Sequence, residues 1–187
     1  MHERSTYPRA MTIAGSDSGA GAGIQADLKV FAALGVYGTS ALTAITAQNT
    51  LGVIAVHELP PSLVIEQIDA IVSDIGVDVV KTGMLSNSTM IETVVNKIVE
   101  HDLRNLVVDP VMVAKGGDRL LQEEAVDSLR SQLIPLALVV TPNVPEAEVI
   151  TERTIQSVSD SRYAARQIVD NMGARNVVIK GGHLNGP

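Results

Sequence analysis

The segment from Thr12 to Lys29, TIAGSDSGAGAGIQADLK, constrains the fold of this chain more than any other. A short apolar run leads into four glycines, and a helical pattern follows them. This order predicts a strand, a tight turn and a helix whose first backbone amides face the turn. Such turns usually hold anions, but Gln25 and Asp27 offer hydrogen bonds that suit a neutral heterocycle. We therefore expect the turn to serve a substrate rather than a phosphate group.

Two common phosphate-binding patterns fit this segment poorly. A P-loop places a lysine directly after its last glycine, whereas the first lysine here is Lys29, well inside the expected helix. Residues 21–26, GAGIQA, match the loose dinucleotide-binding pattern, but no acidic residue lies between Asp27 and Glu58 to hold the ribose. A dinucleotide-dependent oxidoreductase is therefore disfavoured. A glycine turn that only packs a helix against a sheet remains an alternative.

The composition predicts one aliphatic domain. The chain has 187 residues, no cysteine, no tryptophan and one phenylalanine, so its core must consist mainly of Val, Ile, Leu and Ala, as in buried parallel strands. A formal net charge of −7 argues against nucleic acid or an anionic membrane as the main partner. The sequence shows no membrane-spanning apolar run and no signal peptide pattern, so we expect a soluble, cytoplasmic protein. Residues 1–9 are polar, and we expect them to be disordered.

Short apolar runs alternate with stretches of helical periodicity along the chain. The first strand is expected to end at Ala14, and further strands are expected over residues 39–50, 53–56, 78–85, 105–113, 136–143 and 176–183. The segments between them predict helices, among them residues 157–172, with Ser157 as N-cap and Gly173 as the stop. Strands that alternate with helices form parallel sheets through right-handed crossovers. We therefore predict an α/β fold with a doubly wound, mostly parallel sheet and helices on both faces.

Polar residues follow most of these strands, and in a parallel sheet they gather at the carboxyl edge, where ligands bind. Asp109 and Glu146 offer hard oxygens that can hold Mg²⁺, and Lys180 can place a positive charge on phosphate oxygens. A metal, a lysine and an anion site are the main requirements of phosphoryl transfer. Taken singly, each residue also has a structural interpretation, as a strand end or as a favourable helix start.

Six segments occur in one order from about Met11 to His183: GSDSGAGAGIQADLK, TAITAQNT, KTGML, VVDPVMVAKGGD, TPNVPEAE and VIKGGH. Together they resemble the hydroxymethylpyrimidine/phosphomethylpyrimidine kinases of thiamine biosynthesis, within the ribokinase-like superfamily. The resemblance implies one ribokinase-like kinase domain over residues 1–187, without the C-terminal segment of the family. It implies an enzyme that uses ATP and Mg²⁺ to phosphorylate 4-amino-5-hydroxymethyl-2-methylpyrimidine and then its monophosphate. It also implies a homodimer.

The same resemblance implies which residues form the pyrimidine pocket. By position they are Gly15, Asp27, Gln48, Met84 and Val111. Gln48 would bond the aminopyrimidine edge, and Met84 and Val111 would pack against the faces of the ring.

A second set of residues is implied for the metal and the ATP phosphates. It comprises Asp109, Asn143, Glu146 and Lys180. Asp109 and Glu146 would serve the magnesium ion, and Lys180 would be catalytic by bracing the transferring phosphoryl group.

Two departures from the family pattern lead to further expectations. Family members commonly read GSDPSGGAGIQAD, so Ser18, Gly19 and Ala20 alter the turn, and Ala20 is unfavourable if its φ must be positive. The family continues past KGGH into an adenine-binding region and a Gly-Thr-Gly-Cys motif, which supplies the anion hole and activates the acceptor hydroxyl. The 187 residues include neither, so we expect them to be inactive or nearly so alone. The alternatives are a pyridoxal kinase of the same subfamily and a non-catalytic pyrimidine-binding fragment.

Overall fold

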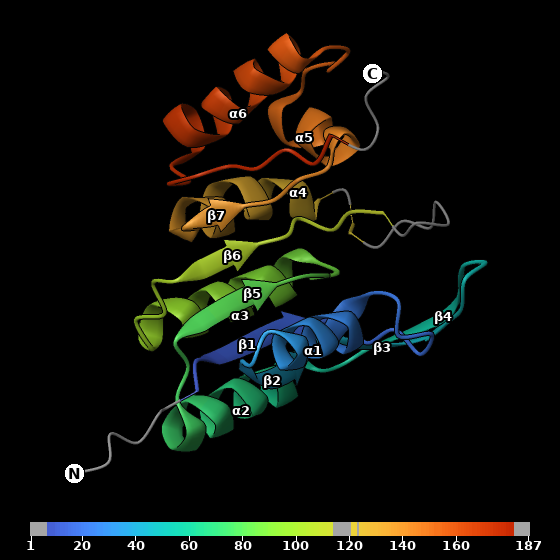
Figure 1. Cartoon of the computed structure of the whole chain (residues 1–187), viewed down its shortest axis with the longest axis vertical. Coiled ribbons are helices and arrows are strands. Elements are labelled where there is room, and N and C mark those ends of the chain that lie inside the picture. Colours follow the sequence, from blue (N-terminus) through green and yellow to red (C-terminus); the bar gives the residue numbers. More distant parts are fainter. Residues whose placement is uncertain (1–6, 114–120, 123, 182–187) are drawn as a thin grey trace.

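The centre of the molecule is a five-stranded parallel sheet. The computed structural model describes residues 7–113, 121–122 and 124–181. The strand order is β2-β1-β5-β6-β7 (Figure 1), and the strands are β1 (Arg9–Ala14), β2 (Tyr37–Leu42), β5 (Val79–Thr82), β6 (Leu106–Val108) and β7 (Val139–Val140). Every neighbouring pair in this sheet is parallel. The predicted α/β class with a mostly parallel sheet is confirmed.

Six α-helices accompany the strands in the described part of the chain. They are α1 (Gly23–Ala33), α2 (Pro61–Ala70), α3 (Ser88–Glu100), α4 (Ala125–Ser128), α5 (Val144–Thr151) and α6 (Val158–Met172). From β1 the chain passes through α1 to β2, the neighbour of β1 at one edge of the sheet. From β5 it passes through α3 to β6 and then through α4 to β7, toward the other edge. Right-handed crossovers in opposite directions place helices on opposite faces, and Figure 1 shows α1 in front of the sheet and α3 and α4 behind it. The sheet is thus doubly wound.

The main core lies between the sheet and the helices α2, α3 and α4. Alternate residues of the strands, such as Met11 and Ile13, are fully buried there. The helices contribute apolar residues spaced three or four apart, which form one stripe on a helix, for example Ile91 and Val94 of α3. A π-helical turn over Ile71–Ile75 prolongs α2. No helix within the described residues has the length and apolar character needed to cross a membrane.

The strand expected over residues 39–50 is two strands. β2 ends at Leu42, and β3 (Ala44–Gln48) pairs with β4 (Val53–Glu58) in a separate antiparallel sheet. The break lies at Thr43, whose backbone N–H donates to Ala14 O and whose hydroxyl donates to Met84 O. Beyond this point β1 has ended, so β3 runs beside the glycine turn instead, where Ser16 N donates to Ala44 O.

Both ends of the chain also differ from the prediction. Arg9, which was expected in the disordered segment, begins β1 because its guanidinium bonds the carboxylate of Asp78. The strand expected over residues 176–183 is reduced to single bridges, Val177 with Val140 and Lys180 with Asn143. Residues 1–6, 182 and 183 lie outside the described part of the chain.

Candidate active site

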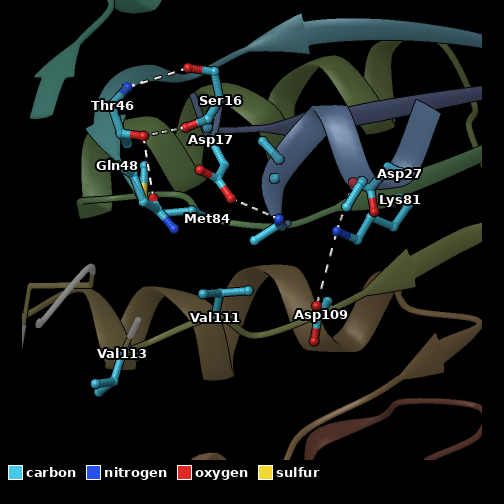
Figure 2. Close-up of a pocket in the computed structure, with 16 residues that line it drawn as sticks. Ser16, Asp17, Asp27, Thr46, Gln48, Lys81, Met84, Asp109, Val111 and Val113 are labelled. Carbon is cyan, nitrogen blue, oxygen red and sulfur yellow. Dashed lines mark hydrogen bonds and ion pairs between the residues drawn. The ribbon is translucent and has the colours of Figure 1, made fainter. Parts of the chain in front are cut away.

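A cavity of about 340 Å³ opens at the carboxyl ends of β1, β5 and β6. The connections that leave β1 and β5 run to opposite faces of the sheet, and such a point is where doubly wound sheets bind their ligands. The lining combines the glycine turn, the start of α1, the end of β3 and the segments after β5 and β6 (Figure 2). Its volume falls in the range of small-molecule sites.

The glycine turn is held closed by its own carboxylate. Asp17, only 4% exposed, accepts hydrogen bonds from the backbone N–H groups of Gly19 (2.8 Å), Gly21 (3.0 Å) and Ala22 (2.8 Å). These amides belong to the turn that leads into α1 at Gly23, where they could otherwise bond an anion. Asp17 therefore occupies the anion position, which supports the expectation that this turn serves a substrate rather than a phosphate.

Close backbone packing explains one glycine of the turn. Gly23 has a φ of +57°, and a Cβ placed there would lie 2.5 Å from Gly15 O. Ala20 has a φ of +59°, so the suspicion raised by its sequence position was correct. The left-handed conformation is costly for any residue with a Cβ.

Gln48 enters the cavity from β3 and is anchored at both its backbone and its side chain. The hydroxyl of Ser18 donates to Gln48 O (2.6 Å) and accepts from Gln48 N (2.7 Å). The side-chain Oε1 of Gln48 lies 3.3 Å from the hydroxyl of Thr46, which itself donates to Ser16 O. Gln48 is thus presented to the cavity in a fixed direction, and its amide group can pair with the edge of a heterocycle.

Apolar side chains bound the cavity next to these polar groups. Figure 2 places Met84, after β5, on the side of the glycine turn, and Val111, after β6, on the opposite side. Met84 packs closely on Gly15, since a Cβ at Gly15 would lie 2.6 Å from Met84 Cε. Two apolar walls with an amide at the edge suit a flat heteroaromatic ring.

A partly buried chain of polar side chains crosses the floor of the cavity. Asp27 Oδ2 accepts from the hydroxyl of Thr12 (2.6 Å) and from Lys81 Nζ (2.9 Å), and Lys81 Nζ lies 4.0 Å from Asp109 Oδ2. The sequence interpretation included Lys81 only as part of the segment KTGML and gave it no role. Its signal was a lysine directly after the two apolar residues that begin β5, Val79 and Val80. Its partner Asp27, 54 positions away, could not be predicted from spacing.

The residues expected at the phosphate side also meet. Lys180 Nζ lies 2.8 Å from Asp109 Oδ1 and 4.0 Å from Glu146 Oε2. Asn143 caps α5 through a reciprocal capping box, in which Glu146 N donates to Asn143 Oδ1 and Asn143 N donates to Glu146 Oε2. Asp109 lines the cavity as well, so it joins the two sets of predicted residues.

The carboxyl of Glu146 is unusual among these groups because it is buried. Burial raises its pKa above the ordinary value, and the Asn143 amide and the Lys180 ammonium only partly oppose this effect. A nearby cation favours the ionised form of such a carboxyl. Asp109 and Glu146 therefore fit, in donor type, a magnesium ion that keeps most of its waters. Lys180 stands between them, and with its side chain 47% exposed it has room to turn toward a phosphate instead.

Comparison with known proteins identifies the family of the chain. A family model described as phosphomethylpyrimidine kinase matches residues 17–187. The hydroxymethylpyrimidine/phosphomethylpyrimidine kinase of Bacillus subtilis (strain 168) is 57% identical over 175 residues, which make up 94% of this chain and 64% of that protein. The chain thus spans about two thirds of the length of this relative.

Two solved structures resemble the chain over almost its whole length. The phosphomethylpyrimidine kinase of Clostridium difficile 630 gives a TM-score of 0.89 at 48% identity, and the match covers 96% of this chain and 78% of that one. A pyridoxal kinase from Staphylococcus aureus in complex with AMP-PCP and pyridoxal gives a TM-score of 0.86 at 37% identity, and the match covers 97% of this chain and 65% of that one. The fold is therefore that of a ribokinase-like α/β protein. The chain belongs to the phosphomethylpyrimidine kinase family.

Proposed function

We propose that the protein phosphorylates 4-amino-5-hydroxymethyl-2-methylpyrimidine, and then its monophosphate, with ATP, as a step of thiamine biosynthesis. One observation carries the proposal. The five residues expected to bind the pyrimidine line a single cavity, and the residues expected to bind the phosphates of ATP adjoin it through Asp109.

The pocket recognises the substrate by shape and by hydrogen bonds. Met84 and Val111 hold the two faces of the ring, and the Gln48 amide pairs with its aminopyrimidine edge. Asp27 uses Oδ2 for Thr12 and Lys81, so its other oxygen remains to accept a hydrogen bond from the ligand. Binding of a flat, amine-bearing ring in this orientation directs the hydroxymethyl group toward Asp109.

The charged edge then positions the nucleotide. Lys180 neutralises phosphate oxygens as a point charge, and Asp109 and Glu146 supply the oxygen ligands for a magnesium ion. Such an ion, when bound, would neutralise the negative charge that the phosphates carry during transfer. Asn143 holds Glu146 in place through the capping box. In phosphoryl transfer, positioning and charge neutralisation supply most of the rate enhancement.

A pyridoxal kinase is the second candidate, because the chain also resembles a solved pyridoxal kinase. Pyridoxal is similar in size but carries no exocyclic amine. An amide and a carboxylate, Gln48 and Asp27, both face the cavity, and this pairing favours the aminopyrimidine. Sites built to bond a substrate group reject analogues that lack the group, because their own polar atoms are left unpaired.

Titration calorimetry with the aminopyrimidine and with pyridoxal tests the assignment. We expect the aminopyrimidine to bind at least about tenfold more tightly, the equivalent of one good hydrogen bond. Gln48→Leu should remove this preference while keeping the volume of the side chain. Tighter binding of pyridoxal would instead assign the second candidate.

A separate assay addresses catalysis. ADP formation is measured for the whole protein with each compound as acceptor. Production of ADP with the aminopyrimidine supports the kinase. Binding of the aminopyrimidine without ADP formation by the whole protein would favour the non-catalytic pyrimidine-binding protein.

A further inference from the structure

The described lining of the cavity carries more negative than positive charges, which disfavours an anionic ligand. Among the described lining residues, three carry carboxylates, Asp17, Asp27 and Asp109, and the single cation is Lys81. Lys180 lies beyond Asp109 and is not part of the lining. A neutral alcohol requires no cation in this cavity. A phosphorylated ligand, with about 1.5 to 2 negative charges at neutral pH, would meet net repulsion without Lys81.

Lys81 has capacity for a further partner. An ammonium group carries three N–H donors, and Lys81 Nζ makes one described hydrogen bond, to Asp27 Oδ2 at 2.9 Å. Its distance to Asp109 Oδ2 is 4.0 Å, which is too long for a hydrogen bond. The side chain is 20% exposed, so its remaining donors reach the cavity, as its position beside Asp109 in Figure 2 shows.

The backbone around Lys81 makes room for this ammonium. A Cβ placed at Gly83 would lie 3.1 Å from Lys81 Nζ and 2.9 Å from the Cβ of Ala14. The absence of a side chain at Gly83 therefore keeps Lys81 directed along the floor of the cavity, between the ring position and Asp109. In the ring orientation proposed above, the hydroxymethyl arm is directed toward Asp109, so a phosphate on this arm would lie next to Lys81.

We propose that Lys81 binds the phosphate of the phosphorylated pyrimidine and thereby adapts the cavity to the second phosphorylation. This inference rests on the proposed function, because it concerns the intermediate of that reaction sequence. Lys180 then serves the nucleotide, and Lys81 serves the acceptor. When the neutral alcohol is bound, Lys81 bonds only Asp27. When the monophosphate is bound, Lys81 bonds both Asp27 and the phosphate.

A purely structural role would give different behaviour. If Lys81 only orients Asp27, its loss would weaken the alcohol and the monophosphate equally, because both present the same ring to Asp27. If Lys81 contacts the phosphate, its loss weakens the monophosphate selectively. Removal of the Asp27 charge then has the opposite effect on the ratio of the two affinities, because Lys81 loses a competing anion.

The test measures the affinity of the chain for the pyrimidine alcohol and for its monophosphate by titration calorimetry. The variants are Lys81→Gln, Asp27→Asn and, as a matched control that removes the other lysine on Asp109, Lys180→Gln. We expect Lys81→Gln to weaken the monophosphate about 10- to 100-fold more than the alcohol, as for the loss of a charged hydrogen bond. We expect Asp27→Asn to weaken the alcohol and to raise the relative affinity for the monophosphate. Lys180→Gln should leave the ratio within about threefold, since its charge lies outside the lining.

The inference would be overturned by equal losses for both ligands in Lys81→Gln, or by an equal selective loss in Lys180→Gln. Should Lys81→Gln fail to fold, Asp27→Asn decides the question alone, and an unchanged affinity ratio in that variant refutes the inference. If the wild-type chain binds the alcohol and the variants give these contrary affinity ratios, the inference fails and the proposed function stands. A wild-type chain that binds neither ligand refutes the proposed function and the inference with it.

Discussion

The two halves of the site are built in different ways. The substrate half is fixed by hydrogen bonds that involve the backbone, those of Asp17 with three amides and those of Ser18 with both backbone groups of Gln48. In the phosphate half only Glu146 is held by backbone hydrogen bonds, those of its capping box with Asn143. Asp109 and Lys180 meet there through a side-chain ion pair in which Lys180 is half exposed. Backbone hydrogen bonds define one geometry, whereas ion pairs near solvent exchange partners at little cost.

This difference matches what each half has to do. A ring of fixed shape is recognised best by a preformed pocket, because a pocket already in its bound form loses little conformational freedom on binding. Phosphates arrive with metal ions and leave with altered charge, so their partners must be able to separate. Single substitutions in the substrate half should therefore lower the stability of the protein. Single substitutions in the phosphate half should mainly lower the affinity for ligands.

The largest effect is expected for Asp17→Ala. The substitution removes a buried carboxylate that accepts hydrogen bonds from three backbone N–H groups, and a hydrogen bond to a charged group contributes about 1.5 to 3 kcal/mol. We expect the free energy of unfolding to fall by about 3 kcal/mol or more, measured by urea denaturation. Lys180→Ala is the matched variant in the phosphate half, and it should cost less than about 1 kcal/mol because its ion pair is exposed. Equal losses in the two variants would remove the distinction between the halves.

A smaller effect is expected for Gly15→Ala. The new methyl would lie 2.6 Å from Met84 Cε, so the end of the Met84 side chain, which lines the cavity, must move. We expect the aminopyrimidine affinity to fall by about 1–3 kcal/mol, as for overpacking of a close-packed site. Met84→Ala removes the clashing Cε, so Gly15→Ala should cost less affinity in that background than in the wild type. An unchanged affinity in Gly15→Ala would mean that the ring does not occupy the space beside Met84.

Ala20→Gly should stabilise the turn. Ala20 has a positive φ of 59°, and relief of the left-handed penalty is worth about 1 kcal/mol. For a chain of this length we expect Tm to rise by about 2–4 °C, measured by calorimetry. Ala22→Gly serves as the control, since Ala22 has a φ of −141° and an extended backbone, and it should give no such gain.

The smallest effect concerns an ion pair far from the cavity. The Arg9 guanidinium lowers the pKa of Asp78 to about 2 from an ordinary value of 3.8. A depressed folded-state pKa adds stability above the unfolded pKa, and this stability is lost as pH falls from about 4 to 2. Urea midpoints of the wild type should therefore drop across this window more steeply than those of Asp78→Asn. Parallel pH profiles of the two proteins would contradict the pairing.

Much of the fold could be predicted from periodicity and cap residues. The helix over residues 157–172 is confirmed as α6, with Ser157 and Gly173 as its caps, because these signals are local. The division of residues 39–50 could not be predicted, since both halves are apolar and β-forming. The break at Thr43 depends on Ala14 and Met84, which are distant in the sequence.

The candidate site shows the same limit. Asp109 and Lys180 were expected at one edge because both follow apolar runs, and the structure brings them within 2.8 Å. The roles of Asp17 and Lys81 were missed, because each depends on what surrounds it in space. Asp17 accepts its hydrogen bonds from amides of the folded turn, and Lys81 of β5 bonds Asp27 of α1. The homodimer and the individual ligand contacts remain predictions.

The most direct measurement is a crystal structure of the chain with the aminopyrimidine bound. The account predicts a ring between Met84 and Val111, with its amine edge on Gln48, and the three amide bonds of Asp17 unchanged from those described. A ring bound elsewhere, or a glycine turn that opens and releases Asp17 on binding, would contradict the claim that the substrate half of the site is preformed.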